Sequence, residues 1–191
     1  MLGPTHPRTF HTDFVDICSV GHGARSLEEF VATLGTAAIQ AMADVRSQPG
    51  SRRHPQFGGQ ALATALREVG IAYVHLPELG GRREPRVDSP HQALRVAAFR
   101  GYADHMNTAE FARGYDRLTS LARESRTAFM CAETLWWRCH RRLIADRLTV
   151  DGWTVTHLFA PGKSEPHVLW DAARTLDGHL VYDAGTLPLL T

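Results

Sequence analysis

Two cysteines, a glutamate and a histidine occur within ten residues of this sequence. Cys131-Ala132-Glu133 ends a short apolar segment, and Cys139-His140-Arg141-Arg142 follows a few residues later. A carboxylate beside histidine and arginine can act as a general base or a nucleophile while the cations hold an anionic substrate. Glu133 could equally pair with one of the two arginines and only tie a strand to a helix. The residue types and their spacing are compatible with both roles.

The same segment contains side chains that bind metals or act as nucleophiles. Cys131, Cys139 and His140 could supply three ligands to zinc, although their spacing is not that of a zinc ribbon or finger. We therefore expect no cofactor, with zinc as a minor alternative. Cys131 is also a candidate nucleophile, because a thiol that faces the start of a helix has a lowered pKa. With Cys18 as the third cysteine, there is no disulfide framework, which favours a reducing compartment.

Two further polar segments are expected at strand ends. Gly21-His22-Gly23 follows a segment rich in β-forming residues, and Asp44-Val45-Arg46 ends a second one. Ligands of open parallel sheets bind beyond the carboxyl ends of the strands. If the strands before His22, Arg46 and Glu133 are neighbours, these side chains meet at one edge, where His22 and His140 would be acid/base partners of the carboxylate.

Hydrophobic patterning predicts the elements that would position these residues. Strands are expected at residues 14–20, 39–45, 71–76, 127–132 and 153–159, with a short edge strand at 179–182. Helices are expected at 26–35 and 60–69, in part of 92–106, after Thr108, and at 138–148. This alternation predicts an α/β fold: an open, mainly parallel sheet of about five strands with helices on both faces, a Rossmann-like three-layer sandwich.

The chain is expected to form one domain. Residues 1–12 are interpreted as a flexible N-terminus and residues 13–191 as a single α/β domain, in which the irregular segment 77–90 would be a loop of the site. No segment is long and apolar enough to cross a bilayer, and residues 1–12 do not have the pattern of a signal peptide. We therefore expect a cytoplasmic protein that does not bind membranes.

The basic residues favour an anionic ligand. Twenty of the 21 are arginines, and residues 46–100 contain nine arginines against four acidic residues, although the net charge is only +1. Arginine forms bidentate contacts with phosphate and carboxylate groups, so Arg46, Arg52 and Arg100 are candidate ligand contacts. Tyr102 and Trp136 are candidates for stacking on a base or sugar, with packing in the core as the alternative for each.

Several of these motifs together resemble a known bacterial family, the domain-of-unknown-function family numbered 488. The resemblance extends over about residues 17–167. Its motifs are Ser19-Val20-Gly21-His22, Asp44-Val45-Arg46, Leu79-Gly80-Gly81, the segment 99–106, Met130-Cys131-Ala132-Glu133 and Cys139-His140-Arg141. Between Glu133 and Cys139 this chain has two tryptophans where family members often have a proline and small residues. The resemblance implies an α/β fold and a cluster of polar residues, and it names no reaction.

Three functions from different classes remain possible on these residues. The first is an enzyme that hydrolyses a phosphate-bearing substrate (a nucleotide, nucleoside or nucleic acid) or cleaves its glycosidic bond, with Glu133 as the key carboxylate and Arg46, Arg100 and Arg141 holding the phosphate. The second is a module that binds a nucleotide or nucleic acid without chemistry. The third is a thiol or metal enzyme built on Cys131 and Cys139.

Overall fold

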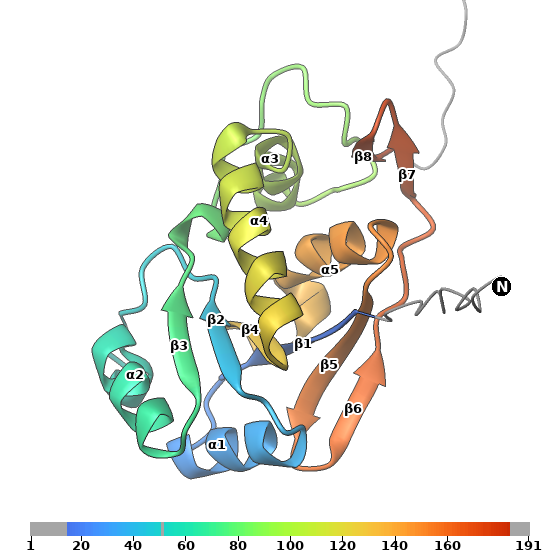
Figure 1. Cartoon of the computed structure of the whole chain (residues 1–191). Helices are drawn as coiled ribbons and strands as arrows, with labels where there is room; N and C mark the ends of the chain where they lie inside the picture. Colours follow the sequence, from blue (N-terminus) through green and yellow to red (C-terminus); the bar gives the residue numbers. More distant parts are fainter. Residues whose placement is uncertain (1–14, 51, 184–191) are drawn as a thin grey trace, which may run out of the picture.

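The computed structural model describes residues 15–50 and 52–183, so the expected flexible N-terminus at 1–12 lies outside the described residues. The strands of the described part are β1 Asp16–Gly21, β2 Ala41–Asp44, β3 Ala72–His75, β4 Thr127–Cys131, β5 Thr154–Ala160, β6 Lys163–Pro166, β7 Ala173–Leu176 and β8 His179–Tyr182. Six of them form one sheet in the order β3-β2-β4-β1-β5-β6, and β7 pairs with β8 in a separate hairpin (Figure 1). Only β6 runs antiparallel to its neighbour in the large sheet.

Five α-helices connect and cover these strands. They are α1 Leu27–Thr36, α2 Gly59–Glu68, α3 Ala97–His105, α4 Ala109–Glu124 and α5 Arg141–Val150, with short 3-10 turns η1 Pro55–Phe57, η2 Pro77–Leu79 and η3 Trp136–Arg138. Ser26 and Thr108 cap α1 and α4, because each side-chain oxygen accepts a hydrogen bond from a backbone N–H in the first turn. The expected starts of these two helices are therefore confirmed.

Alternating strand residues build a core on each face of the sheet. Ile17 and Phe129 pack in one cluster with side chains of α3, α4 and α5, whereas Cys18 and Ala128, their neighbours in the chain, pack in the other with α1 and α2. In Figure 1, α4 and α5 lie in front of the sheet. The predicted three-layer α/β arrangement with a mainly parallel sheet is confirmed.

The strand order brings the expected site segments together. β4 lies between β2 and β1, and the registers place Gly21 beside Cys131 and Asp44 beside Met130. Since all three strands are parallel, their carboxyl ends open at the same edge of the sheet. The residues that follow β1 and β2 therefore start one strand spacing from those that follow β4, on either side of it.

Two hairpins differ from the expectation. No strand was expected at residues 160–166, but Pro161 and Gly162 connect β5 to β6 there. The positive φ of Gly162 (69°) suits the third position of a type II turn. The strand at 179–182 was expected at the sheet edge, but it pairs with β7 instead, through Asp177 and Gly178 with φ of 51° and 79°. Positive φ at both turn positions is the mark of a tight type I′ hairpin.

Candidate active site at the carboxyl edge of the sheet

A pocket of about 820 Å³ opens at the carboxyl ends of β1, β2 and β4. We call it the strand-end pocket. Its walls come from segments that are far apart in the sequence, and the polar side chains among its described lining residues are His22, Arg46, Ser47, Gln48, His54, Arg82, Cys131, Glu133, Arg138, Cys139 and His140. Five residues expected at a common site, His22, Arg46, Cys131, Glu133 and His140, therefore line one pocket. Gly81 and Arg82 of the expected site loop 77–90 line it as well.

Two sulfurs and one imidazole nitrogen meet in the wall of this pocket. The Nδ1 atom of His140 lies 3.6 Å from Cys139 Sγ and 4.0 Å from Cys131 Sγ. Nε2 of the same ring lies 3.2 Å from the backbone oxygen of Val45, which can only accept a hydrogen bond. Nε2 therefore carries the hydrogen, and Nδ1 presents its lone pair to the two sulfurs.

The pKa values of the two thiols are shifted in opposite directions. Hydrogen bonding between them is the largest cause, and it raises the pKa of Cys131 and lowers that of Cys139 well below its ordinary value. Arg141 Nε lies 3.4 Å from Cys139 Sγ and further favours the anion there. Cys139 is therefore the more acidic thiol of the pair, and Cys131 is the less buried one.

Glycines allow the close approach of these segments. A Cβ atom at Gly81 would lie 2.7 Å from His140 Nδ1, so a glycine is needed to leave this nitrogen its space. A Cβ atom at Gly21 would overlap the backbone oxygen of Glu133. The glycine at the end of β1 therefore lets the segment after β4 cross over it.

The side chain of Glu133 is exposed at the pocket, and its carboxylate has no ion pair or hydrogen bond among residues 15–50 and 52–183. Arg141 holds this segment through its backbone, since Nη2 donates to the Glu133 carbonyl oxygen at 2.6 Å. The alternative in which the Glu133 carboxylate pairs with an arginine of α5 is therefore wrong. Arg141 does connect α5 to this segment, but it does so through the Glu133 backbone oxygen and leaves the carboxylate exposed.

Arg46 is largely engaged by its own neighbour. Its Nε and Nη2 atoms donate to the two carboxylate oxygens of Asp44 at 2.8 and 2.5 Å, and both side chains are buried. Tyr73 also donates to Asp44, at 2.7 Å. Nη1 of Arg46 is the edge turned toward His22, 3.4 Å from its Nε2 atom. Arg46 thus brings a fixed donor but little uncompensated charge to the pocket.

His22 is held as a neutral base. Its Nδ1 donates to the backbone oxygen of Gly23 at 2.9 Å, and its ring stacks on Phe57 with centroids 4.2 Å apart. Burial is the main reason that its pKa is lowered to about 4. Near neutral pH its Nε2 therefore has no proton to give and faces Arg46 as an acceptor, which makes it a positioning group rather than an acid.

Other expected contacts lie outside the strand-end pocket. Tyr102 is fully buried and donates to the backbone oxygen of Leu79, and Arg100 donates to the carbonyls of Leu94 and Arg95. Trp136 stacks on His157 at 4.1 Å. Arg141 is 1% exposed and donates hydrogen bonds to Ser19, Cys139 and backbone oxygens. These four side chains serve packing and hydrogen bonding within the protein, and Arg52 is exposed without lining the pocket.

Arg82, Arg138 and His54 are pocket residues that the sequence interpretation did not select. Arg82 lies in the expected site loop 77–90, and this position was the sequence signal that could have identified it as a pocket residue. Its φ of 62° is positive. Arg138 was expected inside the helix after β4, but η3 ends there and Cys139 is extended, so α5 starts only at Arg141. Through this break in the helix, Arg138 reaches the pocket and Cys139 turns back toward Cys131.

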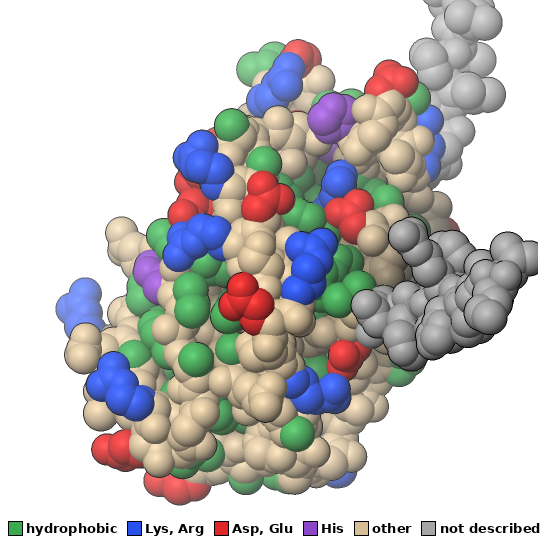
Figure 2. Space-filling model, in the orientation of Figure 1, with side chains coloured by type: hydrophobic (Ala, Val, Ile, Leu, Met, Phe, Trp, Pro, Cys, Tyr) green, Lys and Arg blue, Asp and Glu red, His purple; other side chains and the backbone are tan. Residues whose placement is uncertain are grey.

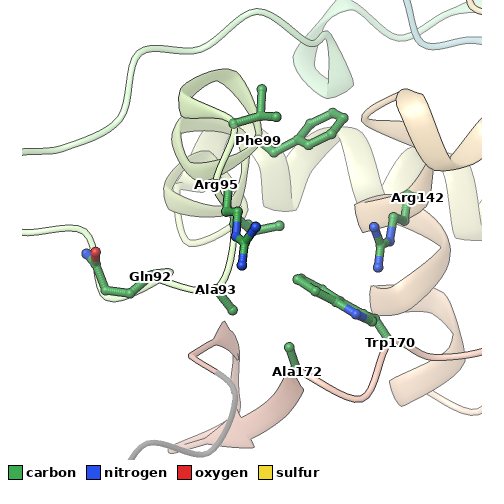
Figure 3. A pocket seen from close by; sticks show the side chains of 9 residues that line it. Gln92, Ala93, Arg95, Phe99, Arg142, Trp170 and Ala172 are labelled. Atoms are coloured by element: carbon green, nitrogen blue, oxygen red, sulfur yellow. The ribbon is translucent and has the colours of Figure 1, made fainter.

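A second, more open pocket of about 570 Å³ lies beside α3 and α5. Figure 3 shows Arg95 and Arg142 pointing toward Trp170 from its two sides. The guanidinium carbon of Arg142 lies 4.3 Å from the centre of the Trp170 ring, which is a cation–π contact. Phe99 lines both pockets, so they adjoin at this side chain.

A buried chain of polar groups links β5 to α5. His157 Nε2 lies 3.0 Å from His167 Nδ1, His167 Nε2 lies 2.9 Å from Asp146, and Tyr182 donates to Asp146 at 3.0 Å. The Nδ1 atom of His157 is buried with no hydrogen-bond partner among the described residues. This chain fastens the β7–β8 hairpin to the rest of the fold.

Lowering the pH should destabilise the protein through His157. Burial is the main reason that its pKa is lowered to about 3 from an ordinary 6.5. Below pH 6.5 His157 binds a proton in the unfolded chain, whereas in the folded chain it binds this proton only near pH 3. Its contribution to stability is therefore complete above pH 6.5 and is lost as the pH falls toward 3.

Urea unfolding of the wild type and of His157→Phe at a series of pH values from about 7 to about 4 tests this prediction. Phenylalanine keeps the stack on Trp136, and the free energy of unfolding should fall less steeply with acid in the variant. A residual slope is expected because His22 is held neutral in the same way. Identical slopes in the two proteins would contradict the prediction.

A comparison with protein families agrees with the resemblance of the motifs, whereas comparisons with curated proteins and with solved structures find no match. In the described residues no helix is long and apolar enough to span a bilayer. The family model described as "Domain of unknown function DUF488" matches residues 26–148, which include most of the lining of the strand-end pocket. On this match, the chain belongs to the DUF488 family.

Proposed function

We propose that this protein is an enzyme that hydrolyses a small phosphate-bearing substrate of the nucleotide class, bound in the strand-end pocket. The observation that carries the proposal is the convergence in this pocket of three arginines with a carboxylate that has no partner among the described residues. A binding site alone has no need of the carboxylate, which repels an anion. A hydrolase uses it to take a proton from water.

Charge supports an anionic substrate. The described lining of the pocket contains three arginines and one carboxylate: Arg46, Arg82, Arg138 and Glu133. Asp44 neutralises Arg46, whereas the guanidinium groups of Arg82 and Arg138 have no ion pair or hydrogen bond within the described residues. These two side chains therefore provide the uncompensated positive charge, and Arg46 adds an oriented donor.

The shape of the strand-end pocket supports a small molecule over a nucleic-acid strand. On the face seen in Figure 2, basic and acidic side chains are interspersed. The adjoining pocket is lined by the Phe99 and Trp170 rings and by the guanidinium groups of Arg95 and Arg142, a mixture that suits a base more than a simple sugar phosphate. A nucleotide with its phosphate near Arg82 and Arg138 is the substrate class that uses these features.

Within this proposal each group has a definite role. Glu133 takes a proton from the attacking water, whose oxygen bonds to the phosphorus atom, and returns this proton to the oxygen that leaves as the phosphate ester bond breaks. Arg82 and Arg138 hold the phosphate. His22 keeps Arg46 in place by accepting from its Nη1 atom. Cys131, Cys139 and His140 form the wall beside the reacting atoms.

Binding is tested by calorimetric titration of the full chain with adenosine monophosphate and with inorganic phosphate. The double variant Arg82→Gln/Arg138→Gln should bind about tenfold more weakly, since two exposed charge contacts of about 0.7 kcal/mol each amount to that factor. Arg52→Gln removes an exposed arginine that does not line the pocket and should bind like the wild type. Equal losses in the two variants would contradict a specific role for the pocket.

Turnover is tested separately, by incubating the wild type with a panel of nucleotides and sugar phosphates and separating the products. Hydrolysis of at least one nucleotide is expected. Salt-dependent binding without turnover of any compound would instead favour a binding module, and the absence of both would overturn the proposal.

A further inference from the structure

We propose that Cys131 Sγ, Cys139 Sγ and His140 Nδ1 bind a zinc ion in the wall of the strand-end pocket, with a fourth coordination position open to the substrate. The inference stands on the geometry of these three side chains. It does not require the proposed hydrolysis, so either proposal can fail without the other.

The three atoms lie close to the spacing that zinc requires. All three lie within 4.8 Å of one another, with the two Sγ–Nδ1 distances at 3.6 and 4.0 Å. Zinc bonds of about 2.3 Å to sulfur and about 2.0 Å to nitrogen, at tetrahedral angles, place sulfur and nitrogen about 3.5 Å apart. The same bond length and angle place the two sulfurs about 3.8 Å apart. Cys131 Sγ and Cys139 Sγ, which lie within 4.8 Å of each other, therefore close the site by approaching one another by at most about 1 Å.

The surrounding hydrogen bonds orient the ligands in the way that metal sites usually do. A metal-binding histidine commonly donates its other ring N–H to a backbone carbonyl, which fixes its tautomer. His140 Nε2 has this contact with Val45, and Nδ1 is left as the ligand atom. Arg141 Nε approaches Cys139 Sγ, and the rest of the guanidinium is fixed by Ser19 and the Glu133 carbonyl. Arg141 therefore helps to fix the position of Cys139 Sγ.

Burial and access match a site that takes one ligand from solution. Cys139 and His140 are buried, Cys131 is partly exposed, and all three line the strand-end pocket. Two sulfurs and an imidazole favour zinc over magnesium or calcium, which prefer oxygen ligands. Three protein ligands with an open fourth position are typical of catalytic rather than structural zinc. A water in that position would lie in the same pocket as Glu133.

The third cysteine provides a matched control. Cys18 is a free cysteine packed in the apolar core between the sheet and the α1–α2 layer, and it is not part of the cluster. Cys18→Ala therefore removes a buried thiol of the same chain without touching the proposed ligands.

The test measures zinc by elemental analysis in the full chain, purified with reductant and without chelator. About one zinc ion per chain is expected in the wild type and in Cys18→Ala. Cys131→Ser, Cys139→Ser and His140→Gln should each bind zinc at least about tenfold more weakly in competition with a chromophoric chelator. Thermal unfolding of each variant separates loss of metal from loss of fold, and Cys131→Ser, at a partly exposed strand end, is the variant expected to fold best.

Cobalt replacement gives a second, independent measurement. The cobalt-loaded wild type should show thiolate-to-cobalt charge-transfer absorption in the near ultraviolet, and Cys131→Ser should lose about half of it, because one of two thiolates is removed. Four results would overturn the proposal: a wild type without zinc, a cobalt protein without this absorption, unchanged zinc affinity in the cysteine variants, or a Cys131–Cys139 disulfide in the reduced preparation, detected by mass spectrometry.

Discussion

Replacing Glu133 with glutamine should lower kcat by about 10²- to 10⁴-fold for the nucleotide that the wild type hydrolyses, the range typical of a lost general base. Glutamine has nearly the same shape and cannot take the proton of the attacking water. Affinity for the same nucleotide should be unchanged or slightly higher, because the substitution removes the one carboxylate from the described lining of the strand-end pocket.

The measurement pairs steady-state kinetics with calorimetric binding on the same preparation. Glu84→Gln is the control, because Glu84 is an exposed carboxylate of the 77–90 loop that does not line the pocket. Equal loss of binding and turnover in Glu133→Gln would indicate a structural carboxylate. Full retention of turnover would place the base elsewhere in the pocket.

Asp44→Ala should cost about 3–5 kcal/mol of unfolding free energy, the largest effect on stability that we expect from a single substitution. Asp44 is completely buried and accepts hydrogen bonds from Arg46 and from Tyr73. Without it, the Arg46 charge stays in a site where it is only 6% exposed and has lost its counter-ion. Urea unfolding at constant pH measures the cost.

The exposed pair of Asp16 and Arg126 is the control for this prediction. Their side chains lie 2.7 Å apart but are 50% and 45% exposed, so Asp16→Ala should cost at most about 1 kcal/mol. The double variant Asp44→Asn/Arg46→Met should recover part of the stability lost in Asp44→Ala, because it removes both charges together. Equal costs for Asp44→Ala and Asp16→Ala would contradict the buried-pair account.

The fold and the place of the pocket could be predicted from local patterns. Apolar segments alternating with capped helices predicted a parallel sheet, and polar residues after three of these segments predicted a site at its carboxyl edge. His22, Arg46 and Glu133 are found there. The prediction succeeded because the carboxyl ends of adjacent parallel strands must share an edge, whatever the details of packing.

The roles of individual arginines and aromatic residues could not be predicted in this way. Arg141 and Arg138 are three residues apart, yet one is buried among backbone oxygens and the other lines the pocket. Tyr102 and Trp136 carry aromatic rings that would suit a ligand, but Tyr102 is fully buried and the half-buried Trp136 stacks on His157. Which side of a segment faces a neighbour depends on contacts from distant parts of the chain.

Sequence patterning alone determined the layers of this protein, the direction of its strands and the edge at which polar groups gather, because these depend on periodicity and on residues close together in the chain. The tertiary structure decided that Asp44 neutralises Arg46, that Val45 leaves His140 Nδ1 available, and that two sulfurs lie within reach of this nitrogen. These are distances of a few ångströms between separate segments. They depend on strand order, on the break between η3 and α5, and on side-chain rotamers, none of which a one-dimensional pattern encodes.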